Sequence, residues 1–374
     1  MRKVITLIGT RPELIKMSRV INELDKNFNH ILVHSEQNYD YELNQIFFDD
    51  LEIRRPDYFL GASKDSAIAS ISDVLIKLDD VLEKEKPDAF LYYGDTNTGI
   101  AIIAAKKRKI PVFHMEAGNR CFDQRVPEEL NRKVIDHLSD INMVLSENAR
   151  NYLLSENINP ERVFKTGSHM YEVLNYYKSK IDKSRILKQL NIKKNKYFLV
   201  SAHREENVDD IRNLKDLLNS LNSLADEYKF PIIFSTHPRT RNNLKKIKNI
   251  KMNKLIQFSK PFSFTDYIQL QKSSLCVLSD SGTLTEESSI LKFAAIMIRQ
   301  THERPEGIDA GILIMSGLKK TNIIDAVKIS ISKGNKKYID NYLINEYKNE
   351  FVSKQIIKII YSYIDYVNTY IWHK

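Results

Sequence analysis

The stretch Ala89-Phe90-Leu91-Tyr92-Tyr93-Gly94-Asp95-Thr96 places an apolar run directly before a glycine and a carboxylate. Three other apolar runs lead into similar short strings, and a helix-like pattern follows: Glu116-Ala117-Gly118, Ala202-His203-Arg204 and Asp280-Ser281-Gly282. Open α/β sheets bind ligands at the carboxyl ends of parallel strands, which is where such strings fall. Two strings lie in each half of the chain. We therefore expect a cleft enzyme that handles a phosphorylated ligand, with a carboxylate-rich half facing a half that carries a histidine and a Ser-Gly turn.

Short β-branched runs alternate with longer helical patterns almost throughout the chain. Buried parallel strands read as continuous apolar runs, and these do. Strands are expected over residues 4–8, 30–34, 89–93, 112–115, 141–145, 162–166, 197–201, 232–235, 255–258, 275–279 and 295–298. Helices are expected over residues 14–24, 70–85, 128–138, 171–180, 209–228, 265–272 and 284–292. The pattern predicts an α/β fold of two Rossmann-like, doubly wound domains facing a cleft.

A length of 374 residues suits two domains better than one core. We place the first domain at residues 1–168 and the second at 169–355. Apolar residues recur at helical spacing near the end of the chain: Ile356, Ile360, Ile364, Val367 and Ile371. The polar face of this helix is not notably basic, so a helix that packs back on the first domain, over residues 356–374, is favoured over a membrane-surface helix.

Composition excludes several classes of protein. The net charge is +9, but the lysine-rich stretches are typical of turns exposed to solvent. The sequence contains no pattern of basic and aromatic residues typical of nucleic-acid binding. Two cysteines, Cys121 and the buried-looking Cys276, allow no disulfide framework and no metal spacing. No apolar run reaches membrane-spanning length, and the start does not resemble a signal peptide. We expect a cytoplasmic protein without nucleic-acid or membrane partners.

The first half offers anion-binding and acidic candidates. Arg11 and Lys16 follow a glycine at the start of a helix, which favours anions, although a turn with a solvated arginine fits equally well. Asp95 and Glu116 end two strands, so their carboxylates should meet; a helix cap is the alternative for Asp95. Strand alternation puts Glu116 on one face with His114, which we interpret as a packed, hydrogen-bonded residue.

The second half offers histidines and a Ser-Gly turn. His203, beside Arg204, can act as an acid, as a base or as a hydrogen-bond donor to a phosphate group, and it is favoured over His237. Either histidine could merely cap a loop. Ser281 and Gly282 open a helix in the manner of a phosphate site, although a helix cap fits nearly as well. A Ser281 nucleophile is disfavoured because no Gly-x-Ser-x-Gly surrounds it.

Taken together, these strings resemble the non-hydrolysing UDP-N-acetylglucosamine 2-epimerase family. The matching strings, collinear from residue 9 to residue 306, are Gly9-Thr10-Arg11-Pro12-Glu13, Gly94-Asp95-Thr96, Glu116-Ala117-Gly118, Pro127-Glu128-Glu129 with Asn131-Arg132, His203-Arg204, Asp280-Ser281-Gly282 with Glu286-Glu287, and Glu303-Arg304-Pro305-Glu306. Each string is weak alone, and the ordered set is specific. From the residues alone, a helix-start preference for acids explains Glu128 and Glu129 fully.

The resemblance implies a glycosyltransferase-B-like fold, a homodimer, and an isomerase that needs neither nicotinamide nor metal. UDP leaves C1 as the C2 proton leaves, and it re-adds to the 2-acetamidoglycal after a proton reaches the opposite face of C2. The resemblance assigns proton transfer to Asp95, Glu116 and Glu128, and the ribose to Glu287. It assigns diphosphate binding to His203, Arg11 and Ser281, with His203 also counted as catalytic. It further implies substrate binding by Lys16, Arg132, His237 and Gly282.

The chain departs from the usual family pattern in two loops. Residues 35–42 differ from the usual Gln-His-type sequence, on which activation by the family's own substrate partly relies, so that regulation is not carried over. The loop Asn119-Arg120-Cys121-Phe122-Asp123 replaces the usual Leu-Arg-Thr. It resembles the branch that makes UDP-N-acetyl-L-fucosamine from UDP-2-acetamido-2,6-dideoxy-L-talose for capsule or O-antigen synthesis. We interpret it as a substrate-specificity loop near C4–C6 of the sugar.

Alternatives differ in their products. The usual family reaction would make UDP-N-acetylmannosamine from UDP-N-acetylglucosamine, and a hydrolysing 2-epimerase would release free sugar. A glycosyltransferase of the same fold would need an acceptor, and the acids Asp95 and Glu116 argue against it. A non-catalytic nucleotide-sugar-binding protein is disfavoured because the acids and His203 are all present.

Overall fold

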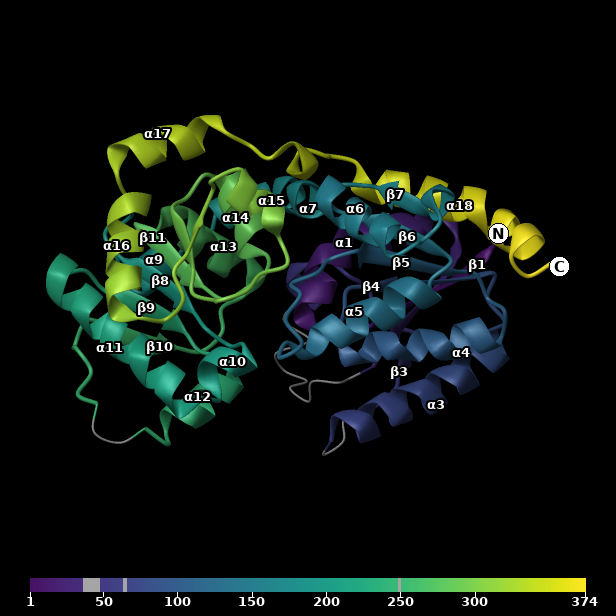
Figure 1. Ribbon diagram of the computed structural model, residues 1–374, viewed down its shortest axis with the longest axis horizontal. Helices are drawn as coiled ribbons and strands as arrows, with labels where there is room; N and C mark the ends of the chain where they lie inside the picture. Colours follow the sequence, from purple (N-terminus) through teal and green to yellow (C-terminus); the bar gives the residue numbers. More distant parts are fainter. Residues whose placement is uncertain (36–47, 63–65, 248–249) are drawn as a thin grey trace. The chain divides into compact units, whose positions relative to one another are not determined.

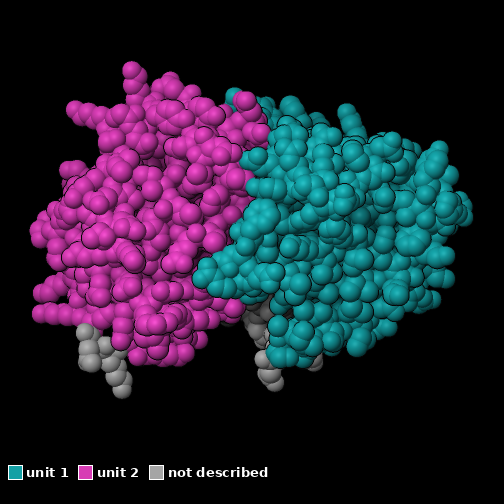
Figure 2. Space-filling view, viewed as in Figure 1, with its two compact units in different colours: residues 1–175, 348–374 teal, residues 176–347 magenta. Residues whose placement is uncertain are grey.

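The computed structural model describes residues 1–35, 48–62, 66–247 and 250–374. These residues form two compact units, one of residues 1–175 with 348–374 and the other of residues 176–347 (Figure 2). The first unit thus extends seven residues beyond the expected boundary at 168. Each unit is a parallel sheet with helices on both faces.

Unit 1 is built on a sheet of seven described strands, all parallel, in the order β3-β2-β1-β4-β5-β6-β7. Its strands are β1 Lys3–Ile8, β2 Asn29–His34, β3 Tyr58–Phe59, β4 Ala89–Tyr93, β5 Val112–Ala117, β6 Ile141–Val144 and β7 Val163–Lys165. β4 is buried at every position because helices cover both of its faces. This double burial explains why the sequence shows a continuous apolar run there.

The helices of unit 1 form two layers (Figure 1). They are α1 Arg11–Asn27, α3 Ala67–Glu85, α4 Ile102–Lys107, α5 Pro127–Leu138, α6 Glu147–Ser155, α7 Met170–Tyr176 and α18 Val352–Tyr370, with the short helices η1 Asn97–Ala101 and η2 Pro160–Arg162. α3, α4 and α5 share one apolar cluster with one face of the sheet. α1 lies on the other face, and α18 packs back on unit 1, where Asp365 pairs with Arg2 at 2.5 Å.

Unit 2 repeats the plan with six described strands, all parallel, in the order β10-β9-β8-β11-β12-β13. The strands are β8 Phe198–Ser201, β9 Ile232–Ser235, β10 Ile256–Ser259, β11 Cys276–Ser279, β12 Ala295–Met297 and β13 Ile314–Met315. Cys276 is fully buried, as expected.

The helices of unit 2 cover both faces of its sheet. They are α8 Lys178–Asp182, α9 Ile186–Gln189, α10 Glu205–Val208, α11 Ile211–Tyr228, α12 Pro238–Leu244, α13 Phe264–Ser273, α14 Leu284–Leu291, α15 Pro305–Asp309, α16 Lys320–Ser330, α17 Lys333–Asn341 and η3 Asn345–Tyr347. α11 and α16 share one core cluster, whereas α9, α13 and α14 share the other.

One expected helix, over residues 171–180, is interrupted. α7 ends at Tyr176 and α8 begins at Lys178. Tyr177 between them is buried, with its ring edge-to-face against Phe264 at 5.8 Å. The chain therefore leaves the helical path at a buried aromatic residue, and α7 and α8 are separate helices. None of the helices in the described ranges combines the length and the apolar character that a membrane span requires.

Candidate functional site

Both sheets reverse their strand order at one point, between β1 and β4 in unit 1 and between β8 and β11 in unit 2. Ligands of open α/β sheets bind at such switch points, outside the carboxyl ends of the strands. In unit 1 the loops at residues 9–10 and 94–96 leave this point, and in unit 2 the loops at 202–204 and 280–282 do so. The strings at residues 94–96, 202–204 and 280–282 therefore lie where a ligand site is expected, and the Glu116-Ala117-Gly118 string lies at the end of the neighbouring strand β5.

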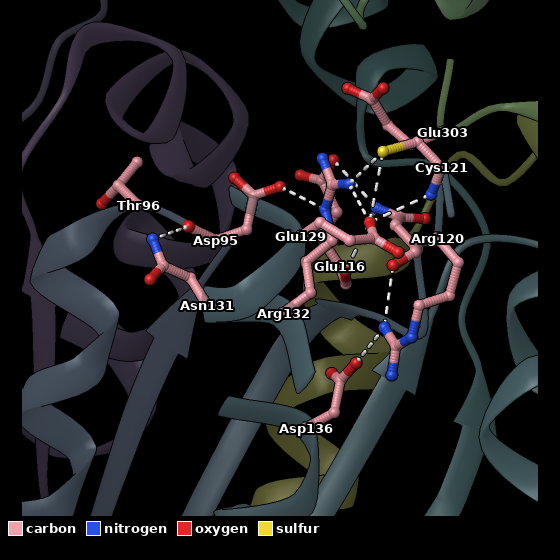
Figure 3. A network of polar contacts seen from close by, with 12 residues as sticks. Asp95, Thr96, Glu116, Arg120, Cys121, Glu129, Asn131, Arg132, Asp136 and Glu303 are labelled. Atoms are coloured by element: carbon pink, nitrogen blue, oxygen red, sulfur yellow. Dashed lines mark hydrogen bonds and ion pairs between the residues drawn. The ribbon is translucent and has the colours of Figure 1, made fainter. Parts of the chain in front are cut away.

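Asp95 is held by a buried arginine (Figure 3). Its Oδ2 accepts a hydrogen bond from Nε of Arg132 at 2.8 Å, and its carbonyl accepts one from Asn131 at 3.0 Å. The short helix η1 is capped by Thr96 instead, so Asp95 is not the helix cap that the sequence left open. The carboxylate of Asp95, about a third exposed, is thus oriented by α5.

Glu129 connects Arg132 to the loop at residues 119–123 (Figure 3). Its carboxylate accepts hydrogen bonds from Nη1 of Arg132 at 2.8 Å and from the backbone N–H groups of Cys121 and Phe122, each at 3.0 Å. Burial raises the pKa of the Glu129 carboxyl, but the Cys121 and Arg132 donors outweigh it and hold this pKa below its usual value. Glu129 therefore positions both the loop and the arginine that holds Asp95.

Asp136 on α5 also holds the loop at residues 119–123. Its carboxylate accepts hydrogen bonds from Arg120 at 2.7 Å and from the N–H of Gly118 at 3.1 Å, and it lies 2.9 Å from Nδ1 of His114. Nε2 of His114 is 2.8 Å from the carbonyl of Gly94, which confirms the packed, hydrogen-bonded role expected for this histidine. The side chain of Arg120 is fully buried, so it holds the loop in place and does not form part of the loop's exposed surface.

Glu116 lies at a β-bulge, and this corrects one expectation. The register of β5 against β6 shifts between Met115 and Ala117, and Glu116 takes a left-handed φ of 66°. A bulge re-aims a side chain, so strand alternation fails here. Glu116 pairs with Nζ of Lys16 on α1 at 2.9 Å, whereas His114 turns to α5 on the other face. The two residues therefore do not share a face.

Gly118 allows the chain to turn directly after the bulge at Glu116. Its φ is 78°, and a Cβ added there would lie 2.4 Å from the carbonyl oxygen of Ala149. Both features exclude a side chain at this position. The Glu-Ala-Gly string is thus a structural requirement for presenting Glu116 at the end of β5.

Glu13 ties together the loops after β1 and β4. Its buried carboxylate accepts hydrogen bonds from the N–H groups of Gly9 and Thr10 and from the hydroxyl of Thr96, the last at 3.0 Å. Burial raises the pKa of the Glu13 carboxyl from 4.5 to about 7, although these hydrogen bonds lower it. The sequence carries a signal for this role, because a glutamate three residues after Thr10 is typical of a capping box at the start of a helix.

The raised pKa of Glu13 predicts a pH-dependent stability. Because the folded-state pKa lies above the unfolded value, its contribution is fully present below about pH 4.5 and is lost as the pH rises through about 7. Glu13→Gln cannot titrate, so its free energy of unfolding relative to wild type should improve by about 2–3 kcal/mol between about pH 5 and about pH 8. Urea titrations of both proteins measure this difference. Parallel pH profiles would contradict the assignment.

The remaining predicted residues of unit 1 are spread over α1, α5 and the loop. Arg11 opens α1 and Glu128 lies in the first turn of α5, both partly exposed. Asn119 is buried, and its amide lies 3.4 Å from Oε1 of Glu116. Phe122 is 70% exposed with a φ of 56°, and Asp123 pairs with Arg125. Most of the loop at 35–42 lies outside the described residues.

In unit 2, Asp280 holds His203. Oδ1 of this fully buried carboxylate is 3.1 Å from Nδ1 of His203, and Oδ2 accepts the backbone N–H groups of His203 and Arg204 at 3.0 Å. Burial raises the pKa of Asp280, but the charge of His203 and these hydrogen bonds outweigh it and lower the pKa to about 2. His203 is 39% exposed, so a fixed imidazole is presented at the end of β8.

The other predicted residues of unit 2 surround the Ser-Gly turn. Ser281 lies 2.9 Å from the hydroxyl of Thr283, which caps α14 without a side-chain bond, so Ser281 is not the helix cap considered as its alternative. A Cβ on Gly282 would lie 3.0 Å from Glu303. Glu287 accepts a hydrogen bond from Gln271 at 2.6 Å.

His237 does cap a helix. Its side chain accepts the N–H of Arg239 at the start of α12, which is the alternative that the sequence left open. Its ring centroid is 6.3 Å from that of His203.

A cluster of one acidic and two basic side chains beside the Ser-Gly turn was not predicted from the sequence. Glu303 pairs with Arg204 at 3.0 Å and with Arg299 at 2.9 Å. The Glu303-Arg304-Pro305-Glu306 string was the available signal. Within the described ranges, no group of three or more His, Cys, Asp or Glu side chains is placed to hold a metal ion.

Comparisons with known proteins show the family to which the chain belongs. A family model described as UDP-N-acetylglucosamine 2-epimerase matches residues 22–361. The UDP-N-acetylglucosamine 2-epimerase of Methanocaldococcus jannaschii is 37% identical, over 88% of this chain and 93% of its own. A Pseudomonas aeruginosa relative, 30% identical over 88% of this chain and 93% of its own, is a UDP-2,3-diacetamido-2,3-dideoxy-D-glucuronate 2-epimerase.

Solved structures show the same fold. The UDP-N-acetylglucosamine 2-epimerase from Rickettsia bellii is 54% identical, with a TM-score of 0.94 and full coverage of both chains. The M. jannaschii enzyme in complex with UDP-GlcNAc and UDP is 35% identical, with a TM-score of 0.89 over 97% of this chain and 100% of its own. The glycotransferase of kitacinnamycin, 10% identical over 96% of this chain and 98% of its own, has a TM-score of 0.60 and shows the fold alone. The fold is two Rossmann-like domains of the glycosyltransferase-B-like kind.

Proposed function

Because the chain belongs to the UDP-N-acetylglucosamine 2-epimerase family, an isomerase family, we propose that it inverts C2 of a UDP-2-acetamido sugar by eliminating and re-adding UDP. The observation that carries the proposal is a pair of carboxylates at adjacent strand ends, each held by a buried cation. Asp95 pairs with Arg132 and Glu116 pairs with Lys16. Carboxyl groups held in a fixed orientation can act as the general base and general acid that proton transfer at a weakly acidic carbon requires.

The residues divide the chemistry between proton transfer and leaving-group stabilisation. Removal of the C2 proton needs a base, and its return to the opposite face needs an acid, for which Asp95, Glu116 and Glu128 are the proposed groups. Departure of UDP places negative charge on the diphosphate, which hydrogen-bond donation by His203 and the positive charge of Arg11 would stabilise.

The nucleotide contacts come from further residues. The Ser281-Gly282 turn at the start of α14 would bind phosphate oxygens through backbone N–H groups. Glu287 would accept the ribose hydroxyls, and Lys16, Arg132 and His237 complete the proposed set. Lys16 and Arg132 already neutralise carboxylates, so we assign them to orienting Glu116 and Asp95 as well as to binding substrate.

For the substrate, we propose UDP-2-acetamido-2,6-dideoxy-L-talose, which gives UDP-N-acetyl-L-fucosamine for capsule or O-antigen synthesis in the cytoplasm. Support comes from the loop at residues 119–123, whose Phe122 exposes an apolar ring beside Cys121. An apolar ring suits the methyl group of a 6-deoxy sugar and leaves a 6-hydroxyl unpaired. The alternative substrate is UDP-N-acetylglucosamine, which the names of the M. jannaschii and R. bellii relatives favour. A homodimer stays a prediction.

The function is tested by incubating the protein with either nucleotide sugar and following inversion at C2 by NMR. We expect inversion of the 6-deoxy-L-talose derivative at about tenfold or higher kcat/KM than UDP-N-acetylglucosamine, the discrimination one substituent supports. Equal or better turnover of UDP-N-acetylglucosamine assigns the protein to the alternative substrate. Free 2-acetamido sugar in the mixture would instead mark a hydrolysing enzyme.

A further inference from the structure

Two consecutive tyrosines on β4 point to opposite faces of the sheet in unit 1. The ring of Tyr92 stacks on His114, and its hydroxyl lies 3.0 Å from the hydroxyl of Thr96. Tyr93 lies on the α1 side, with Nζ of Lys16 at 5.3 Å from its ring centroid and the ring of His169 edge-to-face at 5.2 Å. Both tyrosines are almost completely buried.

The hydroxyl groups of these tyrosines differ in their hydrogen bonding. The phenol oxygen of Tyr93 is buried and, within the described part of the chain, has no hydrogen-bond partner. Burying a hydroxyl without a partner costs free energy that a phenylalanine would not cost, so such a group calls for a cause. Tyr92 shows that the fold can satisfy a tyrosine on this strand.

The position of Tyr93 supplies a cause. Lys16, whose ammonium lies against the Tyr93 ring, has its Nζ 2.9 Å from Oε2 of Glu116. Tyr93 also directly precedes the Gly94-Asp95 turn. The buried phenol therefore lies beside the lysine that holds Glu116, on the strand that leads into Asp95.

We propose that the Tyr93 hydroxyl is a substrate contact that hydrogen-bonds a polar substituent of the sugar ring. The proposal rests on the proposed epimerase function. A phenol both donates and accepts, so it can bond a sugar hydroxyl or the acetamido oxygen. It thereby deepens the site on the sugar side of the substrate rather than on the nucleotide side.

Tyr93→Phe tests the proposal, with Tyr92→Phe as the matched control. For Tyr93→Phe we expect the KM for the UDP-sugar to rise about threefold to tenfold, as for one lost neutral hydrogen bond. Its Kd for UDP, from calorimetry, should stay within about twofold, and its Tm should be unchanged or higher because the unpaired hydroxyl is gone. Tyr92→Phe removes a satisfied hydroxyl and should lower Tm.

Three results would overturn the proposal. They are an unchanged KM in folded Tyr93→Phe, a rise in KM matched by an equal rise in the Kd for UDP, and a fall in Tm as large as that of Tyr92→Phe. A wild-type protein that inverts C2 of neither nucleotide sugar refutes the proposed function itself, so the two failures are distinguishable.

Discussion

Replacing Glu116 by Gln is expected to lower kcat by on the order of 100-fold or more while the affinity for UDP stays near the wild-type value. The amide cannot take or give the C2 proton at neutral pH. It can still accept a hydrogen bond from Lys16, which lies 2.9 Å away in the wild type, so the fold should be preserved. Turnover, calorimetric titration with UDP and thermal unfolding measure the three quantities separately.

Glu147→Gln is the matched control for this change. Glu147 also pairs with a lysine at 2.9 Å, but the pair with Lys165 is exposed and joins the start of α6 to the end of β7, not to the ends of β4 and β5 that carry Asp95 and Glu116. Its turnover should equal that of wild type. Near-normal turnover of folded Glu116→Gln would show that the proposed catalytic carboxylate is wrong.

The second large effect is expected on stability. Asp136→Asn should lower the free energy of unfolding by about 3–5 kcal/mol, since it removes the fully buried one of the two carboxylates that pair with the buried guanidinium of Arg120. The amide group would also point N–H donors at the donors of Gly118 or Arg120. Urea unfolding measures the loss.

Glu156→Gln is the control for Asp136→Asn because it removes the other acid partner of Arg120. The Glu156 side chain is 24% exposed, so water can replace the lost charge and the expected loss is about 1 kcal/mol. Equal losses in the two variants would contradict the view that Asp136 is the buried anchor of the loop at residues 119–123.

Much of the fold is predictable from the sequence because its strands are buried on both faces. β4 and β11 read as uninterrupted apolar runs, and the expected ranges agree with the structure to within a residue. β3 and β13 were not predicted because each has only two residues, which are too few to form a recognisable apolar run. The break at the buried Tyr177 was not predicted from the sequence either.

The candidate site was predictable where its residues sit at strand ends, and less so where tertiary contacts give them their role. A helix-start preference explained Glu129 without revealing that it holds Phe122 and Arg132. Alternation could not show the bulge that re-aims Glu116. The Tyr93 hydroxyl, which has no hydrogen-bond partner among the described residues, could not be recognised inside an apolar run, because the partners of a buried polar atom come from distant parts of the sequence.

Inversion of C2 through loss and return of its proton can be followed by running the NMR assay in D₂O. A base that removes the C2 proton exchanges it with solvent before the proton returns to the other face. The product is expected to carry deuterium at C2, so that its C2 proton signal is absent. Product that retains the original hydrogen at C2 throughout the reaction would contradict the elimination and re-addition of UDP.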